Sequence, residues 1–172
     1  MNDSIDIFFE EWLQQRASLP ALSPDIQFIY RIARLSKILG QRLDRTLVKY
    51  ELTRSQFEAL AALRRKHPEP LCAQDLMAAS LLTSGSVTAM INQMIKAQWV
   101  ERDLHSEDRR RIQIRLTNKG KNKVEAVLRE RIKDNTLLAN LVSKTEQNKM
   151  NLMLKKYLML LEDLESKEES KK

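Results

Sequence analysis

Apolar residues recur every three or four positions along most of this chain, which is the spacing of amphipathic helices. The pattern predicts a short helix over residues 4–16 and a long, one-sided helix from Asp25 to about Tyr50. Pro20 and Pro24 lie between them and favour a linker, because proline disfavours helix in the residue before it. The N-terminal third is therefore expected to hold two helices joined by a proline-containing link.

Three further helices follow, and their order is informative. Thr53 is expected to cap the first, which ends before Pro68. A short helix over residues 73–79, a tight bridge and a longer helix over residues 84–98 come next. This order predicts a helix-turn-helix.

The period then changes to alternation in residues 99–104 and 111–117, which predicts two strands. Polar residues 105–110 join them over a length that suits a hairpin. A helix-turn-helix followed by a hairpin is the order of a winged helix.

Two more helices are expected after the hairpin, with Thr117 or Asn118 capping the first and Thr145 capping the second. The apolar face of the last helix is broad and consists of Met150, Met153, Leu154, Tyr157, Leu158, Leu161 and Leu164, widened by Leu152, Met159 and Leu160. Such a face needs a cover, and the simplest one is a second copy of the chain.

The predicted fold class is therefore mostly α, a winged helix-turn-helix with N- and C-terminal dimerisation helices. Residues 1–50 are expected to form the N-terminal helices, with a possible ligand pocket. Residues 51–117 are expected to form the DNA-binding domain, and residues 118–172 the C-terminal dimerisation helices with a solvated tail.

Composition narrows the function classes. A net charge of +7 and a pI of about 9.6 favour polyanionic partners. No run approaches the ~20 apolar residues of a membrane span, and the N-terminus lacks a basic segment followed by an apolar one. Cys72 is the single cysteine, which is compatible with a reducing cytoplasm, and no metal-ligand spacing is present. The three scattered glycines and the missing nucleophile groupings disfavour an enzyme, and we expect neither cofactor nor metal.

The helix from Ser84 has one side suited to DNA. Its core side is expected to contain Val87, Met90, Ile91, Met94 and Ile95. Its other side offers small and polar residues to the ~12 Å wide major groove, and we expect DNA contacts from Ser84, Ser86, Thr88, Asn92, Gln93 and Lys96. Asn92 and Gln93 can each pair with an adenine edge, and Ala89 can touch a thymine methyl. Taken alone, this pattern is also that of an ordinary solvated helix face.

The hairpin loop favours the DNA-binding interpretation of this helix over the solvated one. It carries three consecutive arginines, of which Arg109 and Arg110 are the expected DNA ligands. An arginine at a hairpin tip can enter the minor groove while the neighbouring helix occupies the major groove. Glu107 and Asp108 would orient these arginines through charge-assisted hydrogen bonds. A solvated turn with local ion pairs is the alternative.

With these residues in view, the sequence resembles the MarR family of bacterial winged-helix transcription regulators. The stretch "VERDLHSEDRRRIQIRLTNKG" is similar to the family's wing signature, at Arg102, Asp108, Arg109, Arg110, Leu116, Thr117 and Gly120. The likeness covers roughly residues 25–165. It implies a cytoplasmic homodimer that binds double-stranded DNA at pseudo-palindromic operators, usually as a repressor, with half-sites about one turn (~10 bp) apart.

The N-terminal helix that carries Trp12 further resembles a subgroup that responds to urate or other aromatic anions. This resemblance implies a small aromatic or anionic effector held by Trp12 and Glu58. Arg31 is the third expected effector residue, as the cationic partner that Glu58 would need if buried. Met90 stands where the subgroup has an arginine, which argues against urate itself. Trp12 could instead simply pin the first helix to the body.

Two other classes stay open from the sequence. One is a winged-helix adaptor that binds proteins and has lost specific DNA binding. The other is an enzyme with an unrecognised site. A dimer without salt-dependent DNA affinity would favour the first, and the missing catalytic motifs argue against the second.

Overall fold

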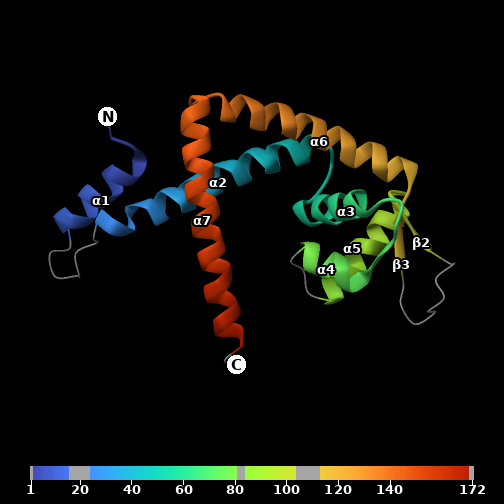
Figure 1. The fold of residues 1–172 in the computed structure, drawn as a ribbon. Coiled ribbons are helices and arrows are strands. Elements are labelled where there is room, and N and C mark those ends of the chain that lie inside the picture. Colours follow the sequence, from blue (N-terminus) through green and yellow to red (C-terminus); the bar gives the residue numbers. More distant parts are fainter. Residues whose placement is uncertain (1, 16–23, 81–83, 104–112, 171–172) are drawn as a thin grey trace. The chain divides into compact units, whose positions relative to one another are not determined.

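A computed structural model of the chain describes residues 2–15, 24–80, 84–103 and 113–170 (Figure 1). Its elements follow the expected order and confirm a mostly helical winged helix-turn-helix with helices at both ends. They are α1 (Ser4–Gln15), the 3-10 turn η1 (Pro24–Ile26), α2 (Gln27–Lys49), α3 (Arg54–Lys66), β1 (Leu71–Cys72), α4 (Ala73–Ser80), α5 (Ser84–Lys96), β2 (Val100–Asp103), β3 (Gln113–Leu116), α6 (Asn118–Ala139) and α7 (Lys144–Glu169).

The chain divides into two compact units. The first runs from Met1 to Val127 and holds the winged domain and the N-terminal helices. The second runs from Leu128 to Lys172 and holds the end of α6 and all of α7.

Local side-chain chemistry sets several helix starts. The Thr53 hydroxyl accepts a hydrogen bond from the Gln56 N–H, and the Gln56 side chain accepts one from the Thr53 N–H, which is a capping box. Thr117 likewise accepts from the Gly120 N–H at the start of α6. Both caps were expected from the sequence.

The expected cap of the last helix was wrong. α7 begins after Ser143, whose hydroxyl accepts from the Glu146 N–H while the Glu146 carboxylate accepts from the Ser143 N–H. Thr145 lies inside the first turn instead. The reciprocal pair of Ser143 and Glu146 satisfies two backbone N–H groups, which an isolated threonine cap cannot do.

Two helices end at residues with left-handed backbone. Glu51 after α2 and Gln98 after α5 have φ values of 51° and 62°. The Leu52 N–H donates to the Leu47 carbonyl, and the Trp99 N–H donates to the Met94 carbonyl, which are the 6→1 bonds of Schellman motifs. This motif ends α5 at Lys96, two residues earlier than the apolar period indicates.

The wing is a three-stranded antiparallel sheet with the order β1-β3-β2. Ile114 of β3 pairs with Arg102 of β2 on one side and with Leu71 of β1 on the other. β2 and β3 were expected from the alternation, whereas β1 was not. Two residues are too few to show a period of two, so the third strand had no sequence signal.

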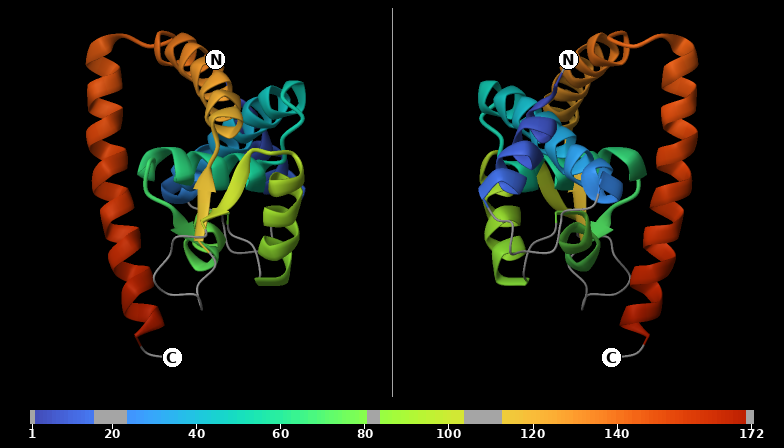
Figure 2. Two further views of the ribbon diagram at one scale, coloured as in Figure 1. Left: turned by 90° about the vertical axis from the view of Figure 1, so that its right-hand side faces the viewer. Right: turned by 90° about the vertical axis from the view of Figure 1, so that its left-hand side faces the viewer.

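A hydrophobic core lies beneath the sheet and between α3, α4 and α5. Figure 2 shows the sheet and α5 next to each other in both views. The largest side chains with almost no exposure are Leu47, Leu60, Leu63, Leu76, Met94, Val100, Ile114, Val124 and Val127. These residues come from α2, α3, α4, α5, the sheet and α6, so the core ties the winged domain to the ends of its neighbouring helices.

The N-terminal helix packs on α2 through aromatic rings. Phe9 of α1 is buried and meets Tyr30 of α2 edge-on, with ring centroids 5.2 Å apart. Arg31 of α2 pairs with Asp3 at 2.7 Å and with Asp6. This ion pair and the aromatic contact attach α1 to the N-terminal part of α2.

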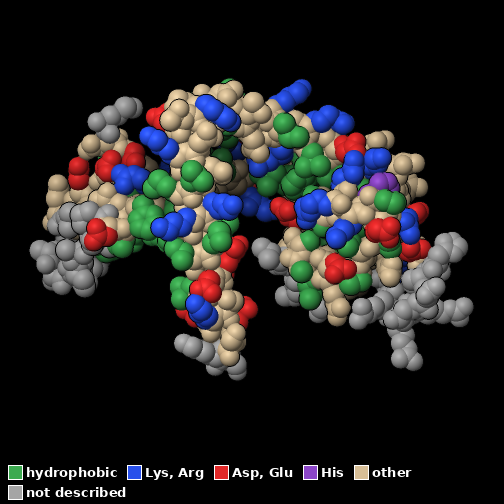
Figure 3. Space-filling model, viewed as in Figure 1, with side chains coloured by type: hydrophobic (Ala, Val, Ile, Leu, Met, Phe, Trp, Pro, Cys, Tyr) green, Lys and Arg blue, Asp and Glu red, His purple; other side chains and the backbone are tan. Residues whose placement is uncertain are grey.

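The second unit leaves its long helix uncovered. α7 has no buried residue although it spans 26 residues. Figure 3 shows its hydrophobic side chains at the surface. Its exposed large apolar residues are Met150, Leu152, Met153, Leu154, Leu158, Met159, Leu160, Leu161 and Leu164.

Candidate nucleic-acid interface

α5 separates an apolar side from a polar side, as its sequence indicates. Val87, Met90, Ile91 and Met94 are buried, whereas the opposite face is exposed. That exposed face consists of Gly85, Ser86, Thr88, Ala89, Asn92, Gln93 and Lys96. The structure therefore presents every described DNA-contact candidate of this helix to solvent, and the side chain of Ser84 lies outside the described residues.

Two of these candidates are held by other side chains of the winged domain. The Gln93 amide oxygen accepts a hydrogen bond from Nε2 of Gln56 at 3.3 Å. The Asn92 amide oxygen accepts one from the Arg102 guanidinium at 3.4 Å. α3 and β2 therefore position the middle of the exposed face of α5, a role for Gln56 and Arg102 that the sequence did not reveal.

The strands of the wing are tied together beside the loop. The Arg115 guanidinium of β3 donates to the Asp103 carboxylate of β2 at 2.6 Å and to the carbonyl of Pro68. The Asp103 side chain is 8% exposed, so water competes little for this ion pair. This ion pair thus holds β2 and β3 together at the base of the hairpin. Arg109 and Arg110 in its loop lie outside the described residues.

The three effector candidates do not meet within one chain. Trp12 stacks at a tilt on Phe8, with ring centroids 5.9 Å apart. Arg31 is engaged by Asp3 and Asp6, whereas Glu58 is half-buried in α3. α3 is anchored near Asp44 of α2, where Arg54 donates to the carboxylate at 2.7 Å.

The spacing along α2 makes the separation plain. Asp44 lies thirteen positions after Arg31, and at 1.5 Å per residue this is about 20 Å. The hydrogen bonds from Arg31 lower the pKa of the Asp3 carboxyl below its usual value, and the same bonds raise the pKa of Arg31. Arg31 in this structure therefore stabilises the attachment of α1.

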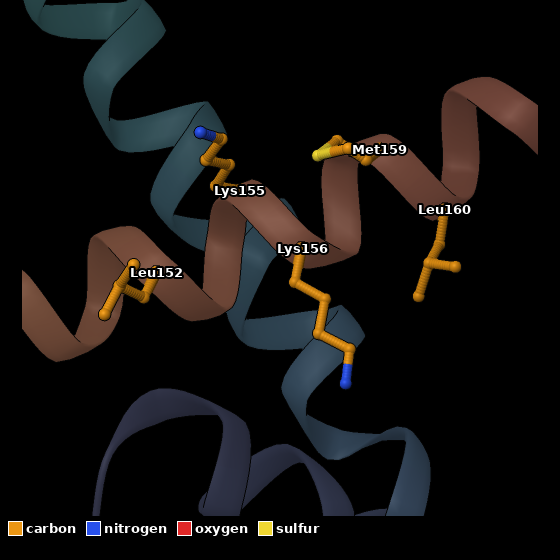
Figure 4. Close-up of a pocket in the computed structure, with 5 residues that line it drawn as sticks. All are labelled: Leu152, Lys155, Lys156, Met159 and Leu160. Carbon is orange, nitrogen blue, oxygen red and sulfur yellow. The ribbon is translucent and has the colours of Figure 1, made fainter.

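Other chemistry is thin in the part of the chain that the structure describes. No group of three or more His, Cys, Asp or Glu side chains there could hold a metal ion. None of the helices formed by those residues is long and apolar enough to cross a membrane. One apolar depression of about 270 Å³ lies on α7 (Figure 4), lined by Leu152, Lys155, Lys156, Met159 and Leu160. All five residues come from one helix, so the depression is a surface feature rather than an enclosed pocket.

Comparison with known proteins agrees with this geometry. Residues 52–112, which include α3, β1, α4, α5 and β2 and end just before β3, match the model of the MarR family. The regulator PecS of Dickeya dadantii is 24% identical over 146 residues, which is 84% of this chain and 87% of PecS.

Solved structures extend the likeness to the fold. The MepR–DNA complex of Staphylococcus aureus has 25% identity and a TM-score of 0.65, over 78% of this chain and 97% of that one. A MarR family protein from Bacillus stearothermophilus has 24% identity and a TM-score of 0.68, over 80% and 95%. A regulator of this kind is not an enzyme. The matched segment, the curated relative and the shared fold thus make this chain similar to the MarR family of DNA-binding transcriptional regulators.

Proposed function

We propose that the protein is a homodimeric, ligand-responsive repressor that binds a pseudo-palindromic operator. The observation that carries this proposal is the pairing of two surfaces on one chain. α5 exposes a narrow polar face above a fully apolar base, and α7 exposes an apolar face with no buried residue. The first surface suits a DNA groove, and the second suits another protein helix.

The apolar surface of α7 supports the dimer. A 26-residue helix is about 39 Å long, and apolar side chains line much of that length. Apolar patches of this extent on a soluble chain mark interaction sites. The N-terminal helix α2 adds exposed Phe28, Leu35 and Leu39. Residues 1–50 and 118–172 therefore serve as dimerisation segments around the DNA-binding residues 51–117.

The DNA-binding mode follows from the winged domain. α5 enters the major groove, with Lys96 and the hydroxyl groups of Ser86 and Thr88 close to phosphates or base edges. Arg109 and Arg110 in the wing loop enter the adjacent minor groove. The net charge of +7 favours association with DNA of any sequence, and the α5 contacts discriminate among DNA sequences.

The effector is a small aromatic or anionic molecule. Trp12 and Arg31 provide an aromatic ring and a cation at one end of α2, and Glu58 provides a carboxylate near its other end. A pocket that uses all three therefore draws on both protomers of the dimer. Its ligand would compete with Asp3 and Asp6 for Arg31, which couples binding to the position of α1.

Selection from fragmented genomic DNA tests the proposal. The purified chain is incubated with the fragments near physiological salt, and the retained DNA is sequenced. We expect an enriched pseudo-palindrome with half-sites one turn (~10 bp) apart, together with a dimer mass by sedimentation. Uniform recovery of all fragments, with no salt dependence, would refute the proposal and favour the protein-binding adaptor.

A further inference from the structure

Two amide side chains stand side by side on the exposed face of α5, and both use their oxygen inside the protein. The Asn92 oxygen accepts from Arg102, and the Gln93 oxygen accepts from Gln56. Each bond turns the oxygen of its amide toward the protein and occupies one of its two lone pairs, so the NH₂ group is the part of the side chain that is left to face solvent.

The direction of each bond is determined by the partner. A guanidinium has only donors, so of the two polar groups of the Asn92 amide only the oxygen can pair with Arg102. Gln56 is restricted in the same way by the capping box, because its oxygen accepts the Thr53 N–H at 3.0 Å. Its Nε2 is therefore the group that faces Gln93 at 3.3 Å. A helix cap thus sets the orientation of an amide on the neighbouring helix.

Only the Gln56 side of this arrangement is buried. Gln56 is 8% exposed, whereas Arg102, Asn92 and Gln93 are exposed. Arg102 lies on β2 opposite Ile114, which is fully buried. The two orienting residues therefore sit on rigid elements, and rigid supports define the direction of a recognition group better than a solvated side chain does.

We propose that Asn92 and Gln93 present their NH₂ donors to the operator and select keto bases, guanine or thymine, at the positions they contact. The inference rests on the proposed function, in which α5 lies in the major groove. Guanine offers N7 and O6 as acceptors and thymine offers O4, whereas a bidentate pair with adenine needs a donor and an acceptor together. The proposed guanine or thymine contacts differ from the adenine contacts expected from the sequence.

The variant Gln56→Glu isolates this effect. Glutamate is a standard residue at that place in a capping box, so the Thr53 N–H keeps its acceptor. The new carboxylate cannot donate, and Gln93 must then turn its NH₂ inward and its oxygen outward. We expect the preferred base at the Gln93 position to change to an amino base, adenine or cytosine. The enrichment of the amino bases over the keto bases should change by about fivefold, which is the effect of one hydrogen bond.

The experiment is a selection from random double-stranded DNA with the full chain, its Gln56→Glu variant and its Gln93→Ala variant. Gln93→Ala identifies the operator position, because discrimination is lost there. Thermal unfolding of each variant controls for folding. If Gln56→Glu does not fold, Arg102→Met serves in its place, since removal of the guanidinium releases the Asn92 oxygen and admits adenine at the Asn92 position.

The outcomes are distinct. A keto base in the parent that changes to an amino base in the variant supports the inference. Adenine at the Gln93 position in the parent, or an unchanged preference in a folded Gln56→Glu variant, overturns it and leaves the proposed function intact. A parent that enriches no motif overturns the proposed function itself, and this inference with it.

Discussion

Gly120 is the third residue of α6, and the structure leaves no room there for a side chain. A Cβ at this position would lie 1.9 Å from the Trp99 carbonyl oxygen and 2.8 Å from its carbon. Both are backbone atoms, so no rotamer change relieves the overlap. Gly120→Ala must therefore displace either the start of α6 or the segment that links α5 to the wing.

The cost follows from what holds the Trp99 carbonyl. It accepts hydrogen bonds from the Thr117 N–H at 3.1 Å and from the Thr117 hydroxyl at 3.0 Å. Overpacking costs about 1–3 kcal/mol, and each weakened hydrogen bond adds about 1 kcal/mol. We expect a loss of about 3 kcal/mol in the free energy of unfolding, which lowers the unfolding midpoint by roughly 6–12 °C for a chain of this size.

Gly85 provides the matched control. It lies in the first turn of α5, and a Cβ there would meet no atom within 4 Å. Gly85→Ala is expected to raise the free energy of unfolding by about 0.4–1 kcal/mol, because alanine restricts the unfolded chain. Urea unfolding of both variants, followed by circular dichroism at one protein concentration, measures the difference. Equal stability of Gly120→Ala and the parent would refute the steric argument.

Three further predictions concern the wing, α7 and α1. Arg109→Ala and Arg110→Ala should each weaken DNA binding and reduce the log-log salt slope by about 0.9 per lost phosphate contact, and unchanged titrations at all salt concentrations would rule out the wing contacts. Ser143→Ala should lower stability by about 1 kcal/mol in urea unfolding through loss of the capping box, whereas Thr145→Ala should have little effect. Arg31 lowers the pKa of the Asp3 carboxyl below its ordinary value of 3.8. Above pH 3.8 the ionised carboxylate therefore stabilises the attachment of α1, and this stabilisation is lost as the pH falls through the lowered pKa. The difference in unfolding midpoint between the parent and Asp3→Asn should therefore shrink from pH 5 towards pH 2, and a constant difference would contradict the assignment.

Contacts close in sequence were predictable. The apolar period revealed the helices, Thr53 and Thr117 revealed two helix starts, and alternation revealed the two long strands. The split of α5 into a buried and an exposed face also follows from a period of 3.6 residues. Each of these features depends on residues within about one or two turns of each other, so a single sequence contains the information.

Contacts between distant residues were decided only by the tertiary structure. Gln56 and Gln93 are 37 residues apart, and Arg31 and Asp3 are 28 apart. Nothing in local periodicity selects such partners, because packing of whole helices brings them together. The sequence alone determined that α5 has polar side chains on one face. The helix and strand packed beside it decided how the amides of Gln93 and Asn92 are oriented, because each amide oxygen accepts a hydrogen bond from one of them.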